Sequence, residues 1–370
     1  MPGRYTGRAW RWERRSSRPS LSVNPALVCS CLGVCLALAA TQPPALGAQR
    51  RLVFQHETYL EKPMEVPIDV AVGLDGFVAI ADIGAAKVLA FRPNGTFLWE
   101  FGEAEAGSGE EELGRVALVD VCPSGDVAVY DSRNQRVILI SATGQFVSGR
   151  ELPFRMGRVD DIVGLKGGGF AIAGRTLWPQ LGVDTLAIHV FDDRLVHLRS
   201  FGPVPDLDHP ELGLWWGVGS LRRTEDGNLM FGRKIPYEIL TFTPLGQLKS
   251  RLEAPFDIAD IHGALRVIKP TNTGDTLDVA LAGKVQIPSG AAPIGPGLIL
   301  SQRSLPQEGI RYWDVFEASG RPIQSERIPD HWLYPLAVGP EQSRVYVLVR
   351  RAEEPAVAIV TIRESVGGGH

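Results

Sequence analysis

The chain has 370 residues, of which 44% are hydrophobic and 22% charged, and its formal net charge at pH 7 is −4. These values are typical of a globular protein, and the length allows two domains or one large all-β domain. Without residues 1–48, 32 basic and 41 acidic residues remain and the net charge is −9. Such an acidic chain is a poor candidate for non-specific binding to nucleic acid.

Residues 1–48 have the features of a signal peptide. Six arginines precede an apolar run from Ala26 to Ala40, which is long enough for a signal sequence and short for a membrane-spanning helix. Small residues at 37–39 and 45–48 offer cleavage sites. We therefore expect an extracytoplasmic protein, periplasmic or secreted, whose mature chain has no transmembrane segment; an uncleaved amphipathic anchor is the alternative. Cys122 is the one cysteine left after cleavage, so we expect no internal disulfide.

A repeated order of short strands begins near residue 69. In the first copy, strands at 69–72, 77–82, 87–91 and 96–99 are separated by turns that include Asp75-Gly76 and Asn94-Gly95. These turn residues tolerate positive φ, as tight hairpins require. Further copies cover about 120–146, 161–193 and 226–246. A fifth copy, stretched by a Gly/Pro-rich insertion near 271–296, ends near 320, and the last covers 344–360.

The spacing of these copies predicts a β-propeller. The turn glycines Gly95, Gly144 and Gly246 lie about 50, or twice about 50, residues apart, and one four-stranded antiparallel blade needs about 40–50 residues. We predict an all-β fold in which residues 49–370 form a single domain, a six-bladed β-propeller of four-stranded antiparallel blades; a β-sandwich is the alternative. The strand at 52–54 is expected to pair with the last blade near 356–360 and close the ring.

The first copy resembles an NHL-type repeat. The resemblance is carried by Pro67-Ile68-Asp69-Val70-Ala71, followed by the runs 76–82, 87–91 and 94–102. The chain as a whole resembles the bacterial, exported six-bladed NHL/TolB-like propellers, well in the first two copies and progressively less in the later ones. This resemblance implies a fold and not a function, because such propellers include binding modules, scaffolds and a few enzymes.

Basic residues recur directly after the second strand of a blade. With strands named a to d from the channel outward, the b–c and d–a loops of a propeller share one face. Five of the six copies place a basic residue at the start of the b–c loop, which makes these residues candidate ligand contacts: Arg133, Arg175, Arg233 with Lys234, Arg303 and Arg351.

Carboxylates and aromatic residues are expected on the same face. Four aspartates occupy the predicted starts of innermost strands, at the channel mouth: Asp69, Asp120, Asp161 and Asp257. They either pair with the arginines and hold the blades in register, or they flank an arginine-rich mouth for an anionic ligand. The aromatic candidates for ligand binding are Trp178, Trp215, Trp216, Tyr237 and Trp332. They suit sugar, peptide or protein recognition, or else they pack under their loops or between blades.

Signals for catalysis are weak. The histidines are scattered without metal-ligand spacing, and no nucleophile elbow or phosphate loop is present in the sequence. We predict no catalytic residue, no metal site and no cofactor. The expected function is non-enzymatic binding of a protein, peptide, glycan or small anionic ligand through the b–c/d–a face. The alternative is a metal-dependent hydrolase or lyase at the central channel, where the aspartates could supply oxygen ligands for Ca²⁺.

Overall fold

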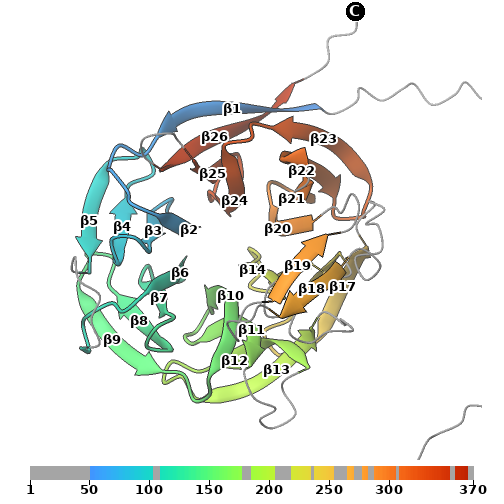
Figure 1. Cartoon of the computed structure of the whole chain (residues 1–370). Coiled ribbons are helices and arrows are strands. Elements are labelled where there is room, and N and C mark those ends of the chain that lie inside the picture. Colours follow the sequence, from blue (N-terminus) through green and yellow to red (C-terminus); the bar gives the residue numbers. More distant parts are fainter. Residues whose placement is uncertain are drawn as a thin grey trace, which may run out of the picture. The chain divides into compact units, whose positions relative to one another are not determined.

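The computed structural model describes residues 51–102, 109–176, 185–204, 218–234, 237–253, 265–270, 277–281, 287–305, 308–350 and 355–365. The described strands belong to one compact unit, Ala48–His370. Apart from one two-stranded hairpin, they form six four-stranded antiparallel sheets, arranged as blades around a central channel (Figure 1). The predicted six-bladed β-propeller is thereby confirmed. No helix in this part of the chain is long and apolar enough to cross a membrane.

Each of the first four blades consists of four consecutive strands, the first of which lines the channel. Blade 1 comprises β2 (Pro67–Val72), β3 (Val78–Asp82), β4 (Lys87–Phe91) and β5 (Phe97–Phe101). Blade 2 comprises β6 (Val116–Val121), β7 (Val127–Asp131), β8 (Arg136–Ile140) and β9 (Phe146–Glu151). Blade 3 comprises β10 (Met156–Gly164), β11 (Phe170–Thr176), β12 (Leu186–Phe191) and β13 (His197–Pro203). Blade 4 comprises β14 (Gly219–Arg223), β15 (Leu229–Arg233), β16 (Glu238–Phe242) and β17 (Leu248–Glu253).

The insertion expected near 271–296 overlaps a separate hairpin that starts earlier, and the later part of that range contains the first strand of blade 5. Strands β18 (Leu265–Pro270) and β19 (Leu277–Leu281) form a two-stranded sheet of their own before blade 5 begins. Blade 5 then comprises β20 (Ile287–Pro293), β21 (Leu298–Leu305), β22 (Ile310–Glu317) and β23 (Pro322–Ile328).

The ring closes through the N-terminal strand, as predicted. Blade 6 comprises β24 (Trp332–Val338), β25 (Arg344–Val349) and β26 (Ala356–Ser365), and its outer strand is β1 (Arg51–Tyr59). The register differs from the expected one, because Leu52 lies opposite Glu364 and Phe54 opposite Ile362. Both strands are longer than the sequence pattern indicated, so residues 358–360 pair with the later part of β1 instead.

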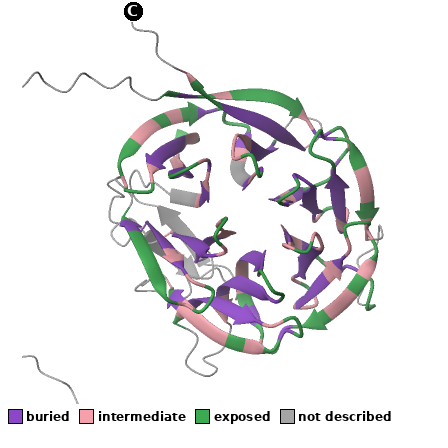
Figure 2. Cartoon of the chain, turned by 180° about the vertical axis from the view of Figure 1, so that it is seen from behind, coloured by how far each residue is buried: buried purple, intermediate pink, exposed green. Residues whose placement is uncertain are grey.

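Turn chemistry and burial explain how the blades form. The expected turn glycines Gly95, Gly144 and Gly246 have φ of 84°, 84° and 86°, a region that is costly for residues with a Cβ. Among the described residues, buried apolar side chains form a cluster in each of the six spaces between neighbouring blades. Inner strands are therefore buried on both faces, whereas the outer strands are partly exposed (Figure 2).

Candidate functional site

Three of the four predicted channel carboxylates lie inside the ring, but within strands and not at strand starts. Asp69 is the third residue of β2, Asp120 the fifth of β6 and Asp161 the sixth of β10. The innermost strands begin earlier in the sequence than their β-branched runs suggested. The aspartates therefore lie further along these strands than the predicted position at the strand start. Asp257 lies outside the described residues.

These aspartates connect each blade to the next through backbone amides. The hydrogen bonds run from Val119 N–H to Asp69 Oδ2 (2.9 Å), from Gly164 N–H to Asp120 Oδ2 (2.7 Å) and from Leu221 N–H to Asp161 Oδ2 (2.8 Å). Ser220 Oγ takes the same part between blades 4 and 5, accepting Ala291 N–H at 3.1 Å. Because each bond joins two innermost strands, the set fixes the register between blades. The partners are backbone amides, whereas the expected interpretation had the predicted b–c arginines in this role.

The arginines that pair with these carboxylates are not the predicted ones. Arg222 and Arg223 are consecutive residues at the end of β14, and the guanidinium of Arg222 contacts Asp161. Arg223 Nη1 lies 3.6 Å from Asp120 Oδ2. Its guanidinium also donates to the carbonyl oxygens of Gly164 and Val121. Blade 4 therefore contributes both positive charges of this network.

Burial sets the protonation of the network. It raises the pKa of Asp120 to about 6, although the Arg223 charge acts in the opposite direction. Burial, reinforced by the Asp161 charge, also raises the pKa of Asp69. Burial disfavours the charged form of Arg222, but the surrounding carboxylates outweigh it and raise its pKa. The channel thus holds two permanent cations beside carboxyl groups that bind protons more readily than exposed ones.

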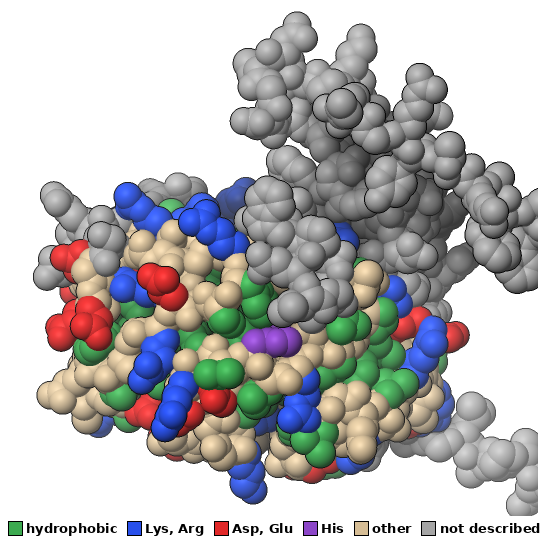
Figure 3. Space-filling view, turned by 90° about the horizontal axis from the view of Figure 1, so that it is seen from below, with side chains coloured by type: hydrophobic (Ala, Val, Ile, Leu, Met, Phe, Trp, Pro, Cys, Tyr) green, Lys and Arg blue, Asp and Glu red, His purple; other side chains and the backbone are tan. Residues whose placement is uncertain are grey.

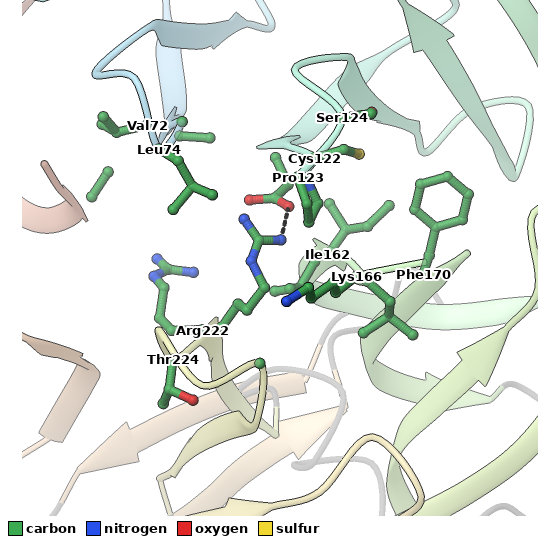
Figure 4. A pocket seen from close by; sticks show the side chains of 18 of the residues that line it. Val72, Leu74, Cys122, Pro123, Ser124, Ile162, Lys166, Phe170, Arg222 and Thr224 are labelled. Carbon is green, nitrogen blue, oxygen red and sulfur yellow. Dashed lines mark ion pairs between the residues drawn. The ribbon is translucent and has the colours of Figure 1, made fainter. Parts of the chain in front are cut away.

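A cavity of about 790 Å³ occupies the channel on the side of the a–b turns. The ion pair of Arg223 with Asp120 lies within it, and Arg222, Lys166 and Thr224 add polar groups (Figure 4). The apolar part of its lining includes Val72, Leu74, Ile162, Pro123 and Phe170. Cavities of about 300–1,000 Å³ with apolar walls and a few converging polar groups are typical small-molecule sites.

The predicted basic residues on the b–c side serve mostly within their own blades. Arg175, Arg233 and Arg303 are still inside β11, β15 and β21, because strand pairing continues past the predicted ends. Arg233 Nη1 lies 3.5 Å from Glu238 Oε2, and Arg303 Nε lies 2.7 Å from Asp314 Oδ2. These partners belong to the same blades as the arginines, so neither pair spans the channel.

The other basic candidates differ in their surroundings. Arg133 is exposed in the loop after β7. Lys234 follows β15, and burial lowers its pKa while Asp160 acts against the shift. Arg351 lies outside the described residues. The side of the ring in Figure 3 shows basic and acidic side chains interspersed among apolar ones.

The aromatic candidates that the structure describes are packed inside. Trp332 is 6% exposed and its ring lies 5.3 Å from that of Trp313. Tyr237 is also 6% exposed, and its hydroxyl contacts Ser301 Oγ. Trp332 packs between blades 6 and 5 and Tyr237 between blades 4 and 5, which is the expected alternative of packing between blades. Trp178, Trp215 and Trp216 lie outside the described residues, so their part in ligand binding stays a prediction.

The sequence did contain a signal for the channel arginines. The inner strands of blades 1 and 2 end in Val70-Ala71-Val72 and Val119-Asp120-Val121, whereas blade 4 ends in Leu221-Arg222-Arg223. Two consecutive arginines at positions that are mainly apolar in the equivalent strands of blades 1 and 2 mark a special position. Among the described residues, no group of three or more His, Cys, Asp or Glu is arranged to hold a metal ion.

Comparisons with known proteins support the architecture. No family model and no curated protein matches the sequence. Solved structures do match: a putative exported protein from Bacteroides fragilis has a TM-score of 0.60 at 11% identity, covering 86% of this chain and 96% of the other. A gluconolactonase from Xanthomonas campestris has 0.53 at 14%, covering 87% and 94%. A streptogramin B lyase has 0.51 at 13%, covering 85% and 99%. At such identities the likeness defines the class of protein by its fold alone.

Proposed function

We propose that this protein is a non-enzymatic binding module that holds a small anionic molecule in its channel cavity. The observation that carries the proposal is the pair Arg222 and Arg223, which lines a cavity large enough for such a molecule. An anionic group of the ligand would lie against the guanidiniums, and its apolar body against Val72 and Ile162.

The local geometry of Arg223 favours an anion beside it, whereas the lining as a whole carries both acidic and basic side chains. The Arg223 Nη1 to Asp120 Oδ2 distance is 3.6 Å, longer than a charge-assisted hydrogen bond of about 2.7–2.9 Å. Asp120 Oδ2 already accepts the N–H of Gly164 at 2.7 Å. A ligand carboxylate or sulfonate can therefore approach the guanidinium without breaking a short ion pair.

Several finer features belong to the same proposal. The N-terminal segment supports export, and the motif at residues 67–102 supports a relationship with the NHL/TolB-like propellers. A second recognition surface on the b–c/d–a face, for a protein, peptide or glycan, remains a prediction, as does the metal-dependent hydrolase or lyase alternative. The similarity to a gluconolactonase and a lyase concerns the fold, so it favours neither the binding function nor the enzymatic alternative.

The probe for the proposed function is 1-anilinonaphthalene-8-sulfonate, which combines an apolar body with one negative charge. We expect one molecule to bind per chain with enhanced fluorescence. Val72→Trp fills the cavity wall and should weaken binding at least about tenfold, equivalent to about 1.4 kcal/mol. The matched control is Val147→Trp, because Val147 is 51% exposed on the outer strand β9.

A variant without the two charges distinguishes the contact with the anionic group from non-specific apolar binding. The double variant Asp120→Asn with Arg223→Gln removes both charges of the pair without leaving either unpaired. It should weaken binding of the sulfonate dye but leave binding of the uncharged dye Nile red unchanged. Equal binding of the sulfonate dye by the wild type and Val72→Trp would refute the proposed site.

A further inference from the structure

A second cluster of chemically capable side chains lies on the outer half of blade 3, away from the channel. His189 is in β12, and His197 and Ser200 are in β13. His189 Nδ1 lies 2.8 Å from Ser200 Oγ, and His197 Nε2 lies 2.8 Å from the same oxygen. Two imidazole nitrogens therefore point toward one place. The sequence did not suggest this, because its histidines showed no ligand spacing.

Strand register explains how the three side chains meet. His189 and Ser200 are direct cross-strand partners, so their side chains lie on the same face of the sheet. A bulge interrupts the pairing between Val190 and Phe191, and His197 lies on this side as well, as its contact with Ser200 shows. The ring of Phe154 packs against both imidazoles, with centroid distances of 5.6 and 5.3 Å. The histidine rings are thus held in place by packing.

We propose that His189, His197 and Ser200 form a binding site for a divalent first-row transition-metal ion, with copper bound most tightly. Neutral imidazole nitrogens suit Cu²⁺ and Zn²⁺, and affinity in a given site is greatest for Cu²⁺. The serine oxygen supplies a third ligand. His197 and Ser200 are only half-buried, so water can complete the coordination.

The distances suit an ion that lies among the three atoms. Metal–nitrogen bonds to histidine are about 2.0–2.1 Å, so neighbouring ligand atoms of a tetrahedral site lie about 3.3 Å apart. Each 2.8 Å contact to the shared hydroxyl would therefore lengthen by about 0.5 Å when a metal ion is bound. Without a metal, the single hydroxyl proton can be donated to only one of the two nitrogens. The other ring must donate its own N–H to the oxygen. A metal ion would use the lone pairs of both rings.

The protonation of the rings favours the same use. Burial lowers the pKa of His189 to about 4, and the neighbouring His197 adds to this shift. Burial lowers the pKa of His197 as well. Burial thus acts on both imidazoles in the direction of the uncharged form, which is the form that binds metal ions.

The test titrates the purified protein with Cu²⁺ in the presence of excess glycine, which removes weakly held ions. We expect one retained equivalent whose electron paramagnetic resonance spectrum shows coupling to two nitrogens. His197→Gln should lose at least about tenfold in affinity. Ser200→Ala is a second variant, which leaves both imidazole rings in place. It should weaken Cu²⁺ binding but keep the coupling to two nitrogens.

His331→Gln is the matched control, because His331 is an exposed histidine beside β24. Retention of Cu²⁺ by His197→Gln as by the wild type would overturn the proposal, as would an equal loss in His331→Gln or no retained equivalent at all. The result is independent of the channel, since none of the three residues lines its cavity.

Discussion

Closure of the ring by β1 can be tested at a single side chain. Leu52 is 3% exposed and packs with Trp313, Trp332 and Ile362, at the junction of blades 5 and 6. Leu52→Ala removes three carbon atoms, each worth about 0.8 kcal/mol on burial. The cavity left behind adds to this loss, so we expect the free energy of unfolding to fall by about 3 kcal/mol. The measurement is urea unfolding followed by intrinsic tryptophan fluorescence.

The neighbouring residue supplies the control. Val53 is in the same strand but is 43% exposed, so Val53→Ala should change the free energy of unfolding by less than about 0.5 kcal/mol. The backbone contacts of Leu52 with Gln324, both 2.8 Å, are retained in either variant. If the two variants lose equal stability, or if Leu52→Ala loses none, β1 does not close the ring as described.

Two further predictions concern the channel network. Asp161→Asn removes the charge that pairs with Arg222 and should lower the free energy of unfolding by at least about 2 kcal/mol. The control Asp330→Asn, at a carboxylate 65% exposed and paired with Arg327 at 3.3 Å, should cost less than about 0.5 kcal/mol; equal losses in urea unfolding would contradict the assigned pairing. Asp120 has a folded-state pKa of about 6, above its usual 3.8, so its stabilising effect is complete below about pH 4 and is lost as the pH rises to about 6. The stability difference between wild type and Asp120→Asn should therefore change across that interval by up to about 3 kcal/mol and stay constant above it, and a pH-independent difference in urea unfolding would refute the raised pKa.

The positions of the cavity and of the expected recognition face show where sequence reasoning reached its limit. The expected recurrence of basic residues after strand b is not what the structure shows, because Arg175, Arg233 and Arg303 still lie within that strand. Arg233 and Arg303 pair with Glu238 and Asp314 in their own blades. The channel network instead uses Arg222 and Arg223, which the repeat pattern did not single out. A repeat shows which positions are equivalent, but it does not show which side chain reaches across to another blade.

The sequence by itself determined the local pattern of strands and turns. Turn residues such as Asn94-Gly95 and Thr143-Gly144, with β-branched runs between them, specify four-stranded hairpin units, because both signals act over a few residues. Six such units and a spare strand then predict a closed ring. What only the tertiary structure decided were contacts between residues far apart in the chain. Asp161 meets an arginine 61 residues away, and Leu52 meets Gln324 across 272 residues. Such pairings depend on how whole blades pack, and His189 and His197 likewise meet through a bulge that no spacing rule predicts.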